Sequence, residues 1–168
     1  MKPAHSITVH RATALEADAA FALIEEYYEA VGVVVRDDRA ALEHYLSSPD
    51  SSIWIAYATR RSGIPGRVPD SLGPTPAGCV MLRPLPQIPF ASEVKRLYVR
   101  PAFRALGIAH SLMQSAENHA RKEGCQWLYL DTKDDLHAAI RFYLSTGYQH
   151  CPRYNDNPQA TIFLRKKL

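Results

Sequence analysis

Residues that could bind an anion gather around position 104. Arg104, Gly107 and Ala109 form the pattern R-x-x-G-x-A, just before a stretch whose apolar residues recur at helical spacing. The first turn of a helix carries unpaired N–H groups and a partial positive charge, so it suits phosphate. The glycine allows close backbone approach, Ala105 and Ala109 keep the path clear, and the arginine supplies charge. The segment therefore predicts a pyrophosphate cradle.

A strand before this cradle and a helix after it would hold it in position. Glu93–Val99 has the composition of a strand, and Pro101 ends it because proline cannot donate into a strand ladder. The helix carries its apolar residues on one face: Ile108, Leu112, Met113, Ala116 and Ala120. A strand, a tight loop and a helix thus follow one another around position 104.

The same strand carries charges on both of its faces. Glu93 and Lys95 face one side and Arg96 the other, because side chains alternate along a strand. Charges on a central strand are costly unless they point into a cleft or pair with one another. Two interpretations are equally open: Glu93 acts in a cleft, or it forms a surface pair with Lys95 or Arg96.

Length and composition predict a single domain that spans residues 1–168, large enough to bury a core. A net charge of +3 is too small to indicate nucleic-acid binding by itself, and no apolar run reaches membrane-spanning length. The first residues lack the continuous apolar region of a secretory signal. Cys79, Cys125 and Cys151 are widely spaced, which favours free thiols in a reducing cytoplasm and no zinc site.

The order of the remaining elements indicates a mixed sheet with covering helices. Apolar patterns predict strands over residues 7–11, 53–59, 77–82, 93–99, 127–130, 148–151 and 160–168. Helices are expected from residue 15 towards 28, over 39–46, from 108 to just before Gly124, and over 136–146. Residues 60–76 are rich in Gly and Pro and predict a long flexible loop. The strand–helix–strand unit around position 104 implies a right-handed parallel crossover.

Two motifs in this order resemble the GNAT superfamily of N-acetyltransferases. The first is R-x-x-G-x-A after L-Y-V-x-P, and the second is A-x-x-F-Y-x-x-x-G-Y from Ala139 to Tyr148. Many members have glycine directly after the arginine, where this chain has Ala105. The resemblance is strong over the C-terminal half and rests on element order over the N-terminal half.

The resemblance implies a fold and a cosubstrate. The fold is an α/β (α+β) arrangement: a central mixed, mostly antiparallel sheet of six to seven strands with a parallel βαβ unit, flanked by about four helices. The cosubstrate is acetyl-CoA, with no metal. Its implied contacts are Leu97, Tyr98, Val99, Arg104, Ala105, Leu106, Gly107, Ile108, Ala109, Ala139 and Tyr143.

Catalytic roles are also implied by the resemblance. Acetyl transfer to an amine requires a neutral amine, a polarised carbonyl and a protonated leaving thiolate. Tyr143 matches the tyrosine that acts as general acid near the CoA sulfur in many members. Glu93 is the favoured base and Asp131 the alternative, with water as an intermediary in similar proteins. Leu136 stands where the family usually has asparagine, which puts one polar contact in doubt.

These observations predict an N-acetyltransferase that moves the acetyl group of acetyl-CoA to a primary amine of a small molecule or peptide. The alternative is a non-catalytic acyl-CoA-binding or regulatory module on the same fold. A nucleic-acid-binding protein is a weaker third reading, and neither nucleic acid nor membrane is expected as a partner. The run Glu25-Glu26-Tyr27-Tyr28 is either a solvated helix end or a wall for a cationic acceptor. Homodimers are common among similar proteins.

Overall fold

A computed structural model describes residues 5–60 and 73–168. Its seven strands form one sheet in the order β1-β2-β3-β4-β5-β7-β6. The strands are β1 (His5–Arg11), β2 (Ser52–Arg60), β3 (Thr75–Pro84), β4 (Ala91–Val99), β5 (Trp127–Thr132), β6 (Gln149–His150) and β7 (Ile162–Lys167). The α-helices are α1 (Ala17–Val31), α2 (Arg39–Ser47), α3 (Ile108–Lys122) and α4 (His137–Ser145). Most of the loop predicted over residues 60–76 lies outside the described residues.

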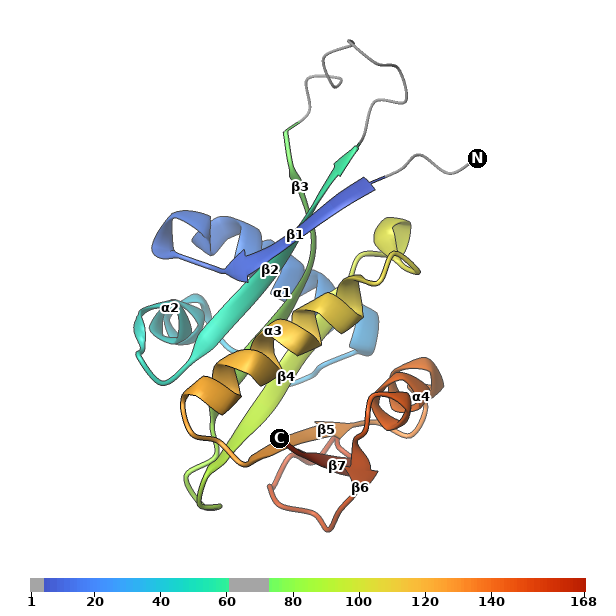
Figure 1. Ribbon diagram of the computed structural model, residues 1–168. Coiled ribbons are helices and arrows are strands. Elements are labelled where there is room, and N and C mark those ends of the chain that lie inside the picture. Colours follow the sequence, from blue (N-terminus) through green and yellow to red (C-terminus); the bar gives the residue numbers. More distant parts are fainter. Residues whose placement is uncertain (1–4, 61–72) are drawn as a thin grey trace.

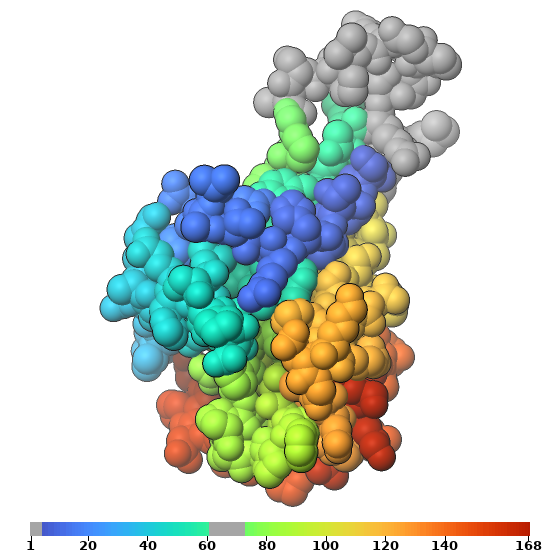
Figure 2. All heavy atoms as spheres, turned by 60° about the vertical axis from the view of Figure 1, so that its left-hand side comes forward, coloured from blue at the N-terminus to red at the C-terminus, as the bar shows by residue number. Residues whose placement is uncertain are grey.

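The helices cover the two faces of this sheet in pairs (Figure 1). The apolar face of α3 packs with α4 against one side, in a core that includes Leu112, Leu128 and Tyr143. On the opposite side, α1 and α2 bury Leu23 and Leu42 against β2 and β3. In the space-filling view, the N-terminal residues in blue and cyan lie beside α3 in orange (Figure 2). The predicted fold class is confirmed, because every strand pair is antiparallel except β4 with β5.

The strand β4 separates from its parallel neighbour after its first three residues. The pairing with β5 covers only Ala91–Glu93, opposite Trp127–Tyr129. Beyond it, a β-bulge changes the register with β3, and Arg96 adopts a positive φ of 56°. A bulge bends its strand, so β4 and β5 diverge beyond Glu93. The gap opens at the carboxyl ends of two parallel strands, where ligands of such sheets bind.

Gly78 on β3 permits a close approach beside this bulge. A Cβ atom at this position would lie 2.5 Å from the carbonyl oxygen of Tyr98 and 3.3 Å from the Cα of Val99. Because the nearest atom belongs to the backbone, β4 itself would have to move. We expect Gly78→Ala to lower the free energy of unfolding by about 2 kcal/mol or more, measured by urea denaturation. An unchanged midpoint would contradict the requirement for glycine here.

No helix in residues 5–60 and 73–168 combines the length and the apolar character needed to cross a membrane. Asp38 caps the start of α2, because it accepts a hydrogen bond from the amide of Ala41 at 2.8 Å. At the other end of the chain, β6 is shorter than the strand predicted over 148–151. The chain leaves the edge after His150, and the segment that follows contacts the residues after α1, where Gln159 accepts from the amide of Val34 at 3.0 Å.

Candidate active site

A cavity of about 980 Å³ follows the gap between β4 and β5. It is bounded by the start of α3, the first half of α4, the end of α1 and the segment between β6 and β7. The predicted residues that line it are Leu97, Tyr98, Val99, Arg104, Ala105, Ala109, Ala139 and Tyr143. Leu106, Gly107 and Ile108 shape the loop and helix start without lining the cavity. Ile108 is 1% exposed and packs in the core instead.

One end of the cavity is the start of α3, which has the geometry of an anion cradle. Gly107 is the residue before the first helical turn, with φ 77°, and no side chain caps this turn. Its N–H groups therefore stay available to an anion. Ala105 adopts a positive φ of 64°, which explains why glycine is common at this position in similar proteins. Arg104 is exposed and anchors its Nε on the carbonyl of Val99 at 3.1 Å.

The bulge of β4 is clamped from the opposite side of the sheet. The guanidinium of Arg96 pairs with Asp37, donates to the hydroxyl of Tyr28 at 3.2 Å and lies over its ring. These contacts offset the cost of a positive φ, which is about 1–2 kcal/mol for a residue other than glycine. The thiol of Cys79 donates to the carbonyl of Arg96 at 3.5 Å. Arg96 therefore fixes the strand segment Leu97–Val99 that lines the cavity.

Tyr143 lies in the wall of the cavity between α4 and β5. Its ring packs edge-on against Tyr148, with 5.8 Å between the centroids, and its side chain is 8% exposed. Burial raises the pKa of its phenol above the ordinary value, and the neighbouring Tyr27 and Asp131 raise it further. The phenol is therefore protonated at neutral pH and can donate a hydrogen bond into the cavity.

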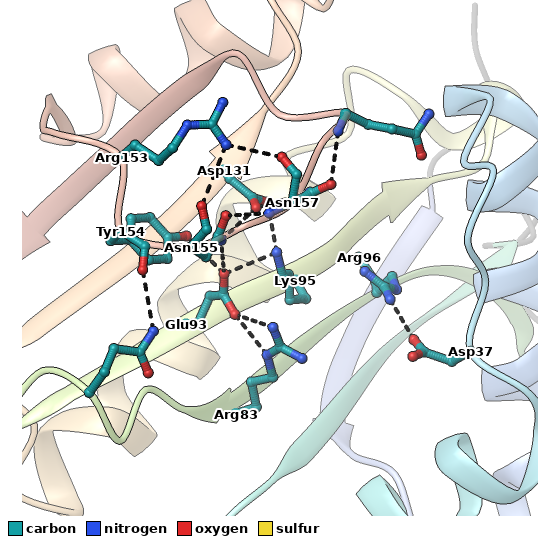
Figure 3. A network of polar contacts seen from close by, with 12 residues as sticks. Asp37, Arg83, Glu93, Lys95, Arg96, Asp131, Arg153, Tyr154, Asn155 and Asn157 are labelled. Carbon is teal, nitrogen blue, oxygen red and sulfur yellow. Dashed lines mark hydrogen bonds and ion pairs between the residues drawn. The ribbon is translucent and has the colours of Figure 1, made fainter.

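The carboxylate of Glu93 is fully buried and surrounded by donors (Figure 3). Its Oε2 accepts from Nε of Arg83 at 2.7 Å, and its Oε1 lies 3.0 Å from Nζ of Lys95. The same Oε1 accepts from the hydroxyl of Tyr154 at 2.9 Å and the amide of Asn155 at 3.1 Å. Glu93 lines a separate pocket of about 270 Å³ and does not line the large cavity. The expected Glu93–Lys95 pair thus forms, but in the interior.

Asp131 lines the large cavity at the end of β5, and both of its oxygens are engaged. Lys95 donates to Oδ1 at 2.7 Å, while the amides of Asn155 and Asn157 donate to Oδ2 at 2.8 and 3.1 Å. Burial acts to raise its pKa, but Lys95 and the two amides outweigh this effect and hold the pKa below its ordinary value. Asp131 is therefore ionised at neutral pH and a weak proton acceptor.

The acidic end of α1 does not face the cavity. Glu26 pairs with Arg100 at 2.7 Å, and Glu25 lies 3.7 Å from Arg36. Of the run Glu25-Glu26-Tyr27-Tyr28, only Tyr27 lines the cavity. The solvated, paired helix end is therefore the better description of these acidic residues.

Sequence reasoning missed several side chains of the cavity wall, among them Arg83 and Lys133. Arg83 and Lys133 stand at the ends of β3 and β5, and Leu136 lines the cavity where the family usually has asparagine. The signal for Arg83 was a cation directly after the predicted strand 77–82, whereas Lys133 follows the predicted strand 127–130 only after Asp131 and Thr132. Asn155 lies in the loop between β6 and β7, which also lines the cavity. Arg153 holds this loop through the carbonyls of Asn155, Asn157 and Ala160 (Figure 3).

Comparison with known sequences gives one family and several relatives. A model of the acetyltransferase (GNAT) family matches residues 17–148. An uncharacterized N-acetyltransferase of Schizosaccharomyces pombe is 38% identical over 95 residues, which are 56% of this chain and 58% of that protein. An acetyltransferase of Agrobacterium fabrum is 42% identical over 55 residues, 33% of this chain and 39% of that protein. The matches thus cover less than two thirds of these relatives.

Solved structures share the fold over nearly the whole chain. A GNAT-family acetyltransferase of Staphylococcus aureus has a TM-score of 0.75 at 18% identity, covering 96% of this chain and 99% of that one. The PaiA N-acetyltransferase of Thermoplasma acidophilum, solved in complex with coenzyme A, has a TM-score of 0.70 at 17% identity. That match covers 97% of this chain and 99% of the archaeal one. At these identities the likeness concerns the fold alone.

Proposed function

The chain belongs to the acetyltransferase (GNAT) family, and on that premise we propose that it transfers the acetyl group of acetyl-CoA to a primary amine of a small molecule or peptide. The observation that carries the proposal is the uncapped start of α3, which opens into the same cavity as Tyr143. A diphosphate bound at this start would leave the rest of the cosubstrate free to follow β4 towards Tyr143. The residues therefore fit acetyl-CoA.

The binding roles follow from position along the cavity. The amides of the first turn of α3, with Arg104, would hold the diphosphate. The small residues Ala105, Ala109 and Ala139 leave room for the chain of the cosubstrate. The backbone of Leu97–Val99 offers strand hydrogen bonds to its amide groups, since β5 does not pair with this part of β4.

The proposed reaction needs two proton-transfer roles from the protein, one at the leaving sulfur and one at the attacking amine. Bound acetyl-CoA supplies the thioester carbonyl and the leaving sulfur. The phenol of Tyr143 would donate a hydrogen bond to that sulfur as negative charge develops on it. A free alkyl amine has a pKa of about 10.4, so it must lose a proton before it attacks. Glu93 is retained as the proposed base and Asp131 as the alternative, each acting through water.

The hydrogen bonds and ion pairs of a carboxylate decide how well it can act as the base. Asp131 accepts from Lys95 and from two amides, and these contacts hold its pKa below the ordinary value and weaken it as a base. A pH profile separates the possibilities. A base on the protein gives an inflection that stays fixed when the acceptor changes, whereas capture of the neutral amine gives one that follows the pKa of the acceptor.

Replacing Arg104 tests the cradle. We expect Arg104→Ala to weaken CoA binding about tenfold, because the variant loses a charged contact to the diphosphate. The measurement is isothermal titration with CoA, repeated at high salt, where the difference should shrink. Arg121→Ala is the matched control, since Arg121 lies at the other end of the same helix and is also partly exposed. Equal affinity of Arg104→Ala and the wild type would count against the cradle.

Turnover separates an enzyme from a non-catalytic module on the same fold. Release of CoA from acetyl-CoA in the presence of a broad amine panel supports the transferase. Tight CoA binding without release under any amine would favour a binding or regulatory role.

Location, assembly and partners complete the proposal. A cytoplasmic location is supported by Cys79, Cys125 and Cys151, which are free thiols. The acceptor is a small molecule or peptide, with no nucleic acid or membrane as partner, in keeping with a net charge of only +3. We also propose that the chain forms a homodimer, and sedimentation would measure its oligomeric state.

A further inference from the structure

The part of the cavity beyond Tyr143 decides which amine can enter. This part, the acceptor end, lies beside Val94 and Lys95 of β4 and Asn155 and Asn157 of the loop between β6 and β7. Apart from Arg104 at the cradle, the charged residues that line the whole cavity are Arg83, Lys95, Arg96, Lys133, Asp131 and Asp156. This set contains four cations and two carboxylates.

The carboxylates near the acceptor end are covered by the protein itself. The side chains of Glu93 and Asp131 are 0% and 6% exposed, and cations and amides occupy their oxygens. Asp37 is held by Arg96 and Tyr28. Among the described residues that line the cavity, Asp156 at the rim is the one carboxylate with an exposed side chain. The cavity therefore offers little negative charge that could bind a second ammonium group of an acceptor.

Two cations of the acceptor end keep accessible surface. The side chain of Arg83 is 36% exposed, and it uses Nε and Nη2 on the single oxygen Oε2 of Glu93. The side chain of Lys133 is 27% exposed; its Nζ donates to the carbonyl of Val31 and lies 3.8 Å from Asp135. By contrast, Lys95 is 9% exposed and shared between two carboxylates. Apart from Arg104 at the cradle, Arg83 and Lys133 are thus the most exposed cations among the described residues that line the cavity.

A guanidinium that already binds one carboxylate through one edge still has N–H groups on the other edge. These donors match a carboxylate in a planar, charge-assisted contact. Because this contact would form inside a cavity and not on an open surface, it would gain more than an exposed ion pair. The acidic residues of α1 could attract a polycation, but they are paired away from the cavity.

We propose that the acceptor is a small amino acid, a primary amine that also carries a carboxylate, with the carboxylate bound by Arg83 and Lys133. This inference rests on the proposed transferase function and names its substrate class. In the reaction, the amine nitrogen forms a bond to the acetyl carbon and the carbon–sulfur bond breaks. The amine loses one proton and the sulfur gains one, so the products are an N-acetylamino acid and CoA.

Matched acceptor pairs test the proposal. Each pair contains an amino acid and the amine that lacks only its carboxylate, such as phenylalanine with phenethylamine, tyrosine with tyramine, and ornithine with putrescine. Release of CoA from acetyl-CoA measures kcat/KM for both members. In at least one pair, we expect the amino acid to exceed its amine about tenfold or more, the size of one charge-assisted contact. The amino acid amide, which lacks the negative charge, should behave like the amine.

Two variants locate the preference. Arg83→Gln should lower the ratio of kcat/KM for the amino acid to kcat/KM for its matched amine about tenfold, mainly through the KM of the amino acid. Since Arg83 also pairs with buried Glu93, Lys133→Gln serves as a second variant outside that ion pair, with a smaller loss in the same direction. Thermal melts and CoA titration check that both variants fold and bind the cosubstrate.

The outcomes are distinguishable. Amines or polyamines that match or exceed their amino acids would overturn the inference and leave the transferase function intact. A preference for amino acids that survives in both variants would also overturn it, because the carboxylate would then bind elsewhere. Absence of CoA release with every acceptor would contradict the proposed function, and this inference with it.

Discussion

Tyr143→Phe is expected to lower kcat about 100-fold or more while the dissociation constant of acetyl-CoA changes less than threefold. The substitution removes the hydroxyl that faces the cavity and keeps the ring that packs against Tyr148. The pKa of Tyr143 is raised above its ordinary value by burial, so the phenol stays protonated as the pH rises to about 10. Tyr143 should therefore add no falling limb to the rate below that pH. Steady-state kinetics and titration measure both effects.

Tyr148→Phe is the matched control for this experiment. Tyr148 is also buried and donates to Glu117 on α3, at 3.5 Å, without lining the cavity. Its replacement should cost about 1 kcal/mol of stability and leave kcat unchanged. Equal rates for Tyr143→Phe and the wild type would remove Tyr143 from the mechanism. A similar loss of rate in both variants would point to packing and not to the hydroxyl of Tyr143.

The parts of the site that are local in sequence could be predicted from the sequence. The cradle depends on a few adjacent residues from Arg104 to Ala109, so one short sequence motif is enough to predict its loop and the start of the helix. The sheet and its covering helices follow from apolar spacing, which sets which face of each element is buried. Tyr143 stands on a helix whose end is marked by Gly147.

The parts that depend on distant partners could not be predicted. Arg96 adopts a positive φ although no glycine marks the bulge, because Tyr28 and Asp37 hold it from 68 and 59 residues away. Glu93 was recognised as a costly charge on a central strand. Its partners Tyr154 and Asn155 lie 61 and 62 residues further along the chain, so spacing could not reveal them. Side-chain networks between elements follow from the assembled fold.

Replacing Lys95 should have the largest effect on stability. Lys95→Met removes the cation between Glu93 and Asp131, whose side chains are 0% and 6% exposed. The two carboxylates would then keep only Arg83, the hydroxyl of Tyr154 and neutral amides as donors. Breaking one partner from a buried ion network costs about 3–5 kcal/mol. Urea denaturation at pH 7 measures the change, and a loss below about 1 kcal/mol would contradict the network's role.

The pH dependence of this loss distinguishes charge from packing. In the wild type, the lowered pKa of Asp131 contributes stability that is present above its unfolded value of about 3.9 and is lost as the pH falls through the lower folded value. Without Lys95, burial is less opposed and moves the folded pKa upwards, so the charged form loses this advantage at neutral pH. The deficit of Lys95→Met should therefore be largest at pH 7 and shrink as the pH falls through about 4.

Adding Asp131→Asn to Lys95→Met should recover part of the deficit at pH 7, since one buried charge is then gone. A deficit that is constant with pH and unchanged in the double variant would assign the loss to packing of the lysine side chain.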